Sequence, residues 1–253
     1  MVNILYLIVF LGGVLLESRS ITAGTECPSG DFQVQWTSAP SARKPDEVLD
    51  EMRILTLPKE EAEELEIWKK GRPKQGSLGD LSCADYMREN QAALSADSDG
   101  EWNWHGPSWR SSQFLKDCLA LYLVSKAKPA RHNCIVNFQL SRSTANVLPS
   151  TLGLIISSIG QRGMSETKSL PAWAPKMKFS LENSNELVGK QGGDKFEEDH
   201  FSGIAFGDFD GDGYQDLLIS MRNISGGTYG ELRMAVLSRK TPSGMLSHAL
   251  VKK

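Results

Sequence analysis

The densest group of side chains able to bind a cation lies between Asp208 and Asp216, in the run Asp-Phe-Asp-Gly-Asp-Gly-Tyr-Gln-Asp. Its four carboxylates repel one another strongly unless a cation lies among them. Oxygen-only ligands on a flexible loop are what Ca²⁺ prefers. We therefore predict a calcium loop with four carboxylate ligands and one main-chain carbonyl, that of the tyrosine. These ligands are Asp208, Asp210, Asp212, Tyr214 and Asp216.

Two alternatives compete with this interpretation of the loop. A surface turn without an ion is one, but four repelling carboxylates disfavour it. An EF-hand is the other, because the first positions counted from Asp208 fit its pattern. Its twelfth position should be a bidentate Glu and is Ile219 here. The flanking residues also resemble strands rather than the helices of an EF-hand, so we expect the loop to join two strands.

The stretch from Phe201 to Ile219, FSGIAFGDFDGDGYQDLLI, resembles an FG-GAP repeat of the integrin α and VCBS-like type. Residues 226–236 resemble the next strand of that repeat, so the resemblance covers about residues 178–240. It implies that the Asp-rich loop joins two strands of a propeller blade and binds Ca²⁺ through the five ligands named above. Only one copy is present, and one repeat cannot bury its own faces. We therefore expect it to pack against the N-terminal part, or the chain to assemble with others, rather than a full propeller.

The first residues predict an export signal followed by two structural regions. Ile4–Leu16 is a thirteen-residue apolar run, too short to span a bilayer comfortably. We predict a signal peptide over residues 1–23, a mixed α/β domain over 24–165 and an FG-GAP-like β repeat over 166–253. The fold class is α+β. The protein is expected to be secreted or periplasmic, with no stable membrane span after removal of the signal.

Hydrophobic periodicity places the expected elements along the chain. Strands are predicted at residues 32–36, 134–140, 201–206, 217–220 and 231–237. Helices are predicted at residues 46–52, 60–70, 108–126 and around Cys83, with a break at 97–107. Residues 152–158 fit either a strand or a buried helical segment. Four aromatic residues near the break can stack on a ligand, but packing in the core or at its rim is favoured. They are Trp102, Trp104, His105 and Trp109.

The chain contains four cysteines, Cys27, Cys83, Cys118 and Cys134. An even number in an exported chain indicates two disulfides, and four cysteines allow three pairings. The pairing Cys83–Cys118 is favoured because both residues lie on predicted helices. No two are spaced as a CxxC metal site requires.

Charge and the remaining motifs limit the function. The net charge of −3 gives no sign of nucleic-acid binding. Ten acidic residues between Glu182 and Asp216 face only Lys190 and Lys195, so this segment should attract cations, although for its first half a solvated loop is the favoured interpretation. We find no HExxH, GxSxG or GxxxxGK[ST] motif.

The sequence thus predicts a secreted calcium-binding protein rather than an enzyme. The ion would be structural, and the protein would bind or adhere to a protein or glycan partner. One alternative is a metal-dependent hydrolase with His200 as the base. Another is a secreted inhibitor or partner-binding protein that acts through its helical domain.

Overall fold

We analysed a computed structural model of the 253-residue chain. It describes residues 26–37, 39–42, 45–70, 80–89, 101–104, 108–153, 168–183, 185–191, 197–225 and 229–249. The predicted signal peptide lies outside these residues. The structure combines helices with antiparallel sheets, which confirms the α+β class. In the described part of the chain, no helix is both long and apolar enough to cross a membrane.

The helices lie mainly in the first half of the chain. They are α1 (Pro45–Ile54), α2 (Lys59–Lys70), α3 (Cys83–Glu89), α4 (Trp109–Lys126) and α6 (Leu170–Trp173), with 3-10 helices η2 (Thr144–Val147) and η3 (Ser150–Leu152). Helix α4 begins where the sequence predicts, because the Ser108 hydroxyl accepts a hydrogen bond from Ser111 N–H and the Ser111 hydroxyl bonds back to the Ser108 main chain.

The strands form one large sheet and two short pairs. The short pairs are β1 (Ser29–Phe32) with β7 (Ala130–His132), and β4 (Thr56–Leu57) with β5 (Leu81–Ser82). The large sheet contains β2 (Gln35–Trp36), β3 (Ala39–Ala42), β6 (Glu101–Trp104), β8 (Lys178–Asn183), β9 (Glu186–Gln191), β10 (Glu197–Gly207), β11 (Asp216–Ser225), β12 (Tyr229–Ser238) and β13 (Ser247–His248).

Strands β10, β11 and β12 are the long centre of the large sheet, whose order is β13-β12-β11-β10-β2-β3. Strand β9 pairs with β10 and β8 with β9, while β6 pairs with β12. Strands β2, β3 and β6 precede residue 165 in sequence. The two predicted regions therefore contribute to one sheet.

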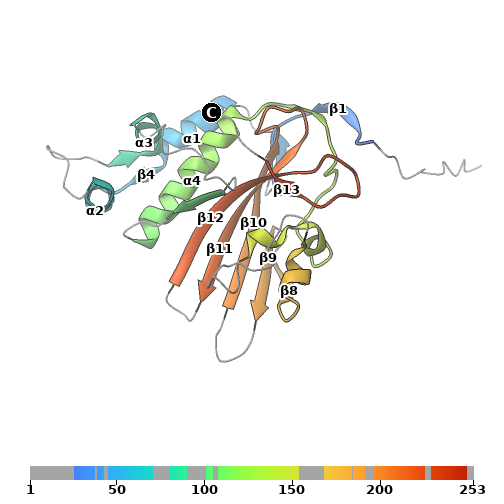
Figure 1. Cartoon of the computed structure of the whole chain (residues 1–253). Coiled ribbons are helices and arrows are strands. Elements are labelled where there is room, and N and C mark those ends of the chain that lie inside the picture. The colour runs from blue at the N-terminus through green and yellow to red at the C-terminus, as the bar shows by residue number, and fades with distance from the viewer. Residues whose placement is uncertain are drawn as a thin grey trace, which may run out of the picture.

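Both faces of the sheet are covered. Helix α4 lies across one face, with α1, α2 and α3 beyond it (Figure 1). Leu218 and Val236 join the helical core on that face, whereas Leu217 and Ile219 join a second core on the other. Alternate residues of a strand point to opposite faces, so β11 supplies both cores. The single repeat thus buries its faces against the N-terminal elements, as expected.

Three predictions about elements are wrong or only partly tested. Residues 134–140 form turns rather than a strand, and Asn137 has a φ of 55° that interrupts extended backbone. The predicted break at 97–107 contains strand β6, whose Trp102 is buried, as core packing requires. Within residues 152–158, Leu152 ends the short helix η3, and residues 154–158 lie outside the described part.

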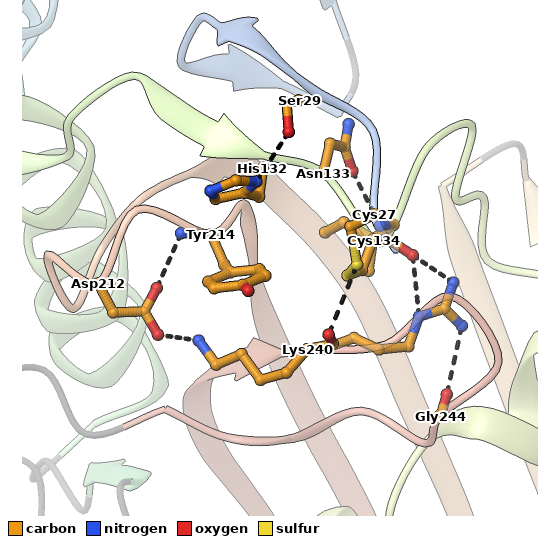
Figure 2. The surroundings of a disulfide bond; sticks show 11 residues. Cys27, Ser29, His132, Asn133, Cys134, Asp212, Tyr214, Lys240 and Gly244 are labelled. Carbon is orange, nitrogen blue, oxygen red and sulfur yellow. Dashed lines mark hydrogen bonds and ion pairs between the residues drawn. A yellow bond between two sulfur atoms is a disulfide. The ribbon is translucent and has the colours of Figure 1, made fainter. Parts of the chain in front are cut away.

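The cysteine pairing also differs from the prediction. Cys27 and Cys134 form a disulfide (Figure 2). Cys83 and Cys118, by contrast, are free and buried. The antiparallel pairing of β1 with β7 brings Cys27 beside Cys134, although they are 107 residues apart. Cys83 and Cys118 lie on contacting helices, α3 and α4, in the same core. Burial and a hydrogen bond with Cys83 raise the pKa of the Cys118 thiol, which keeps it protonated.

Candidate calcium site

The acidic loop joins the paired ends of β10 and β11. Gly207 pairs with Asp216, so Asp208 and Asp216 leave and enter the sheet side by side. Gly211 and Gly213 have φ values of 80° and 88°, in the left-handed region that glycine adopts at little cost. The sequence therefore predicted correctly both the flanking strands and the residues that let the loop turn tightly.

The loop carboxylates first organise the loop itself. Asp208 accepts hydrogen bonds from Gly211 N–H at 2.7 Å and Gly213 N–H at 3.0 Å. Asp210 accepts one from Asp212 N–H, and Asp212 accepts one from Tyr214 N–H. These short-range bonds are the usual way in which Asp stabilises a turn.

Three carboxylates converge at the base of the loop. One ligand atom from each of Asp208, Asp210 and Asp216 lies within 4.8 Å of the others. Asp216 is fully buried, and its Oδ2 accepts a hydrogen bond from Phe209 N–H at 3.0 Å. Its Oδ1 is buried and receives no hydrogen bond of good geometry, although the hydroxyl of Ser238, its cross-strand neighbour on β12, is near enough to lower the pKa of the carboxyl. Burial is the main cause that raises the pKa of Asp216 to about 7; the negative charges of Asp210 and Asp208 add to the rise, while the Ser238 hydroxyl and Phe209 N–H oppose it.

The side chains of the other two predicted ligands, Asp212 and Tyr214, both contact Lys240. The Asp212 carboxylate forms an ion pair with the Lys240 ammonium and is not part of the three-carboxylate cluster (Figure 2). The Lys240 ammonium also lies 4.6 Å from the centroid of the Tyr214 ring, whose other side faces the His132 ring at 5.0 Å. Partial burial lowers the pKa of Lys240, while Asp210 and Asp208 oppose that shift.

Main-chain hydrogen bonds from strand β7 and from Lys128, both in the N-terminal region, anchor the acidic loop. Gly213 C=O accepts hydrogen bonds from Arg131 N–H and His132 N–H, and Gln215 N–H donates to His132 C=O at 2.8 Å. Lys128 and Asp208 exchange a pair of main-chain bonds of 2.9 and 3.0 Å. The main chain on both sides of the Tyr214 carbonyl is thus anchored. Sequence reasoning missed this support and Lys240, because no local pattern links residues 128–132 or 240 to the loop.

The donor set fits a hard divalent cation. Three carboxylates with one buried, unpartnered oxygen need positive charge, and a carbonyl and waters can complete the six to eight oxygens that Ca²⁺ takes. His200, the base considered for a hydrolase, lies eight residues away along β10, or roughly 25 Å at the rise of a strand. Its ring contacts Glu186 at 2.9 Å and Glu198 at 3.3 Å instead.

Comparison with known proteins agrees with this location. Residues 201–223 match the family model of the FG-GAP repeat. Searches of curated proteins and of solved structures returned no match to the chain. The matched residues contain the second half of β10, the acidic loop and most of β11. The C-terminal part of this chain therefore carries one copy of an FG-GAP repeat, whose loop is the acidic site.

Proposed function

We propose that this protein is a secreted calcium-binding protein whose ion stabilises the loop between β10 and β11. The observation that carries the proposal is the buried, unpartnered Oδ1 of Asp216 beside two further carboxylates. Asp208, Asp210 and Asp216 would bind the ion directly. The Tyr214 carbonyl would add a fourth protein ligand, and Asp212 would join by leaving Lys240.

The ion would act structurally rather than in catalysis. It would tie the ends of β10 and β11 together and neutralise the charge that burial makes costly. Extracellular modules bind Ca²⁺ with a Kd of about 10⁻⁴–10⁻³ M, so millimolar Ca²⁺ outside a cell would occupy the site. The disulfide between Cys27 and Cys134 is consistent with an oxidising compartment.

The role that we infer for the ordered surface is binding or adhesion. FG-GAP repeats are typically binding modules, and one is present here. The alternative of a partner-binding helical domain receives less support, since α4 packs on β10 and β12 and the helical region shares its core with the sheet. The alternative of a hydrolase with His200 as base is disfavoured by the distance of that residue from the loop.

Calorimetric titration of the protein with Ca²⁺, and with Mg²⁺ as a control, tests the calcium site. We expect one Ca²⁺ site in the wild type and none in Asp216→Asn, because the buried ligand charge is lost. At a free Ca²⁺ concentration ten times Kd, the folded state should gain about 1.4 kcal/mol. Asp50→Asn, which changes an exposed helix residue, should bind as the wild type. Absence of Ca²⁺ binding by the folded wild type would refute the proposal.

A second variant tests the role of Asp212. Asp212→Asn should weaken Ca²⁺ binding if the carboxylate exchanges Lys240 for the ion. Unchanged affinity would remove Asp212 from the ligand set while leaving the three clustered carboxylates in place.

A further inference from the structure

Behind the calcium loop lies a cavity of about 650 Å³, a size typical of small-molecule sites. Three parts of the chain line it: residues 32–37, the turn segment 133–140, and the β10–β11 hairpin with the residue before β9. Gln215, which stands between the predicted ligands Tyr214 and Asp216, is one of the lining residues. The cavity therefore adjoins the calcium loop without overlapping the carboxylate cluster.

The lining of the cavity is neutral but rich in hydrogen-bonding groups. None of the sixteen described residues that line it is charged, although charged residues make up 23% of the chain. Six side-chain amides provide both donors and acceptors. They are Gln35, Asn133, Asn137, Gln139, Asn185 and Gln215. Four aromatic rings add flat apolar surface, those of Phe32, Trp36, Phe138 and Phe206.

Gln215 is the residue that points most directly to a ligand. It is only 5% exposed, and its side chain makes no hydrogen bond to another residue in the described part of the chain. By contrast, Asn133 accepts a bond from Ile135 N–H, and Asn185 donates one to Gly203 C=O. The amide atoms of Gln215 are not among the buried polar atoms without a partner, so they face the cavity, where they are open to a ligand or to water.

The rim of the cavity is held in an unusual conformation. Asn137 has a φ of 55° and is exposed, in a turn closed by a bond from Phe138 N–H to Ile135 C=O. Conformations of this kind often occur at ligand sites, where the surrounding structure enforces them. The Cys27–Cys134 disulfide and the bonds from the Arg239 guanidinium to Cys134 C=O anchor this turn (Figure 2).

We propose that this cavity binds a neutral oligosaccharide; this rests on the proposed binding function and names its ligand class. Amide groups match sugar hydroxyls, which donate and accept, and aromatic faces match the C–H surfaces of sugar rings. A charged sugar would find no counter-charge among the described lining residues. An extended peptide is disfavoured, because β2 pairs with both β10 and β3, and β10 pairs with β11 on one side and with β9 and β2 on the other, so neither offers a free strand edge.

The test uses the signal-free protein on an array of neutral oligosaccharides built from mannose, galactose, glucose and N-acetylglucosamine. Sialylated and sulfated glycans and uncharged peptides are included on the same array. We expect binding to neutral oligosaccharides. Titration with the strongest of these should show about tenfold weaker binding for Gln215→Leu, because the hydrogen bonds between the Gln215 side-chain amide and the oligosaccharide are lost. Gln33→Leu makes the same change at an exposed residue outside the cavity and should bind as the wild type.

A second variant covers the case in which Gln215→Leu fails to fold. Asn137→Gly keeps the left-handed backbone and removes only an exposed amide at the rim, so it should fold and bind more weakly. Binding to acidic glycans or peptides alone, no binding to the array, or full affinity in both folded variants would overturn the proposal.

Calcium titration of the same samples separates this proposal from the calcium site. Ca²⁺ uptake without neutral glycan binding rejects the cavity and leaves the calcium site standing. Neutral glycan binding in chelator by a protein that takes up no Ca²⁺ rejects the calcium site and supports the cavity.

Discussion

The acidic run from Glu182 to Asp216 consists of two regions that differ in whether the protein supplies partners for the buried carboxylate oxygens. In the first, around β9 and the start of β10, acidic side chains have protein partners. Glu198 pairs with Lys190 at 2.5 Å and with His200 at 3.3 Å, and Asp199 accepts a bond from Asn223. In the second, the acidic loop of residues 208–216, Asp216 keeps a buried oxygen without a hydrogen-bond partner.

The pKa values show the same contrast. Hydrogen bonds from Lys190 hold the pKa of Glu198 below its usual range, with His200 acting in the same direction. Burial instead raises the pKa of Asp216 to about 7. Acidic residues close together in sequence therefore do not by themselves require a metal ion. What decides is whether the fold brings a hydrogen-bond donor or a cation to every buried carboxylate oxygen.

Arg233→Met should produce the largest loss, because it breaks the compensation in the first region. Arg233 is 3% exposed and donates to the Asn223 amide oxygen, Leu152 C=O and Gly153 C=O. Removing the guanidinium leaves these acceptors buried, so unfolding in urea should show a loss of about 3–5 kcal/mol. Arg53→Met, at an exposed ion pair, should change stability by less than about 0.5 kcal/mol. A loss below about 1 kcal/mol in Arg233→Met would contradict the role given to this network.

The matched variants Asp199→Asn and Asp216→Asn compare the two regions directly. In chelator at pH 8, Asp216→Asn should stabilise the protein, because a buried charge with no cationic partner is removed, while one oxygen remains to accept the bond from Phe209 N–H. Asp199→Asn should destabilise it by about 1–3 kcal/mol, since the bond from the Asn223 amide then joins two neutral groups and loses its charge assistance, but should leave Ca²⁺ binding intact. Thermal unfolding and calorimetry measure both effects. Shifts in the same direction would show that the two regions do not differ as described.

The pH dependence of protein stability tests the same difference between the two acidic regions. Because the pKa of Asp216 is raised in the folded state, the folded chain binds a proton between about pH 4 and 7 that the unfolded chain does not. The ion-free protein should therefore gain stability as pH falls from 8 to 5, by about 2.5 kcal/mol. The Ca²⁺-induced rise in Tm should shrink over the same window, because the ion needs the carboxylate.

Asp216→Asn is the control for this pH effect. Subtracting its pH profile removes the contributions of other groups, and the gain assigned to Asp216 should disappear in the variant. The lowered pKa of Glu198 acts at lower pH, where its stabilising contribution is lost as pH falls. A pH profile in chelator that is the same in the wild type and in Asp216→Asn would show that Asp216 is not the group responsible.

Lys240→Met should have the smallest effect. Its ammonium is the cationic partner that the loop has from the protein itself, but the ion pair with Asp212 is about half exposed. Such pairs contribute at most about 1 kcal/mol. Stability in chelator should fall slightly, and Ca²⁺ affinity should rise a few-fold because Asp212 no longer has a competing partner. Weaker Ca²⁺ binding in calorimetry would indicate that Lys240 supports the loop rather than competing with the ion.

The local spacing of apolar, Asp and Gly residues was enough to predict many of the helices and strands and the acidic loop. The strands at residues 201–206, 217–220 and 231–237 fall within β10, β11 and β12, and the helices at 60–70 and 108–126 correspond to α2 and α4. The loop and its tight turns follow from short-range patterns of Asp and Gly. The prediction failed at residues 134–140, because the alternation of apolar residues does not reveal that Asn137 turns the chain.

The sequence by itself determined the acidic loop, its flanking strands and the kind of cation that its oxygens prefer, since these depend on residues a few positions apart. Tertiary structure alone decided that Cys27 pairs with Cys134, that Lys240 reaches Asp212, and that Gln215 lines a neutral cavity. Each of these contacts joins segments far apart in the chain. Their pairing depends on how two cores form on opposite faces of one sheet, which no local pattern specifies.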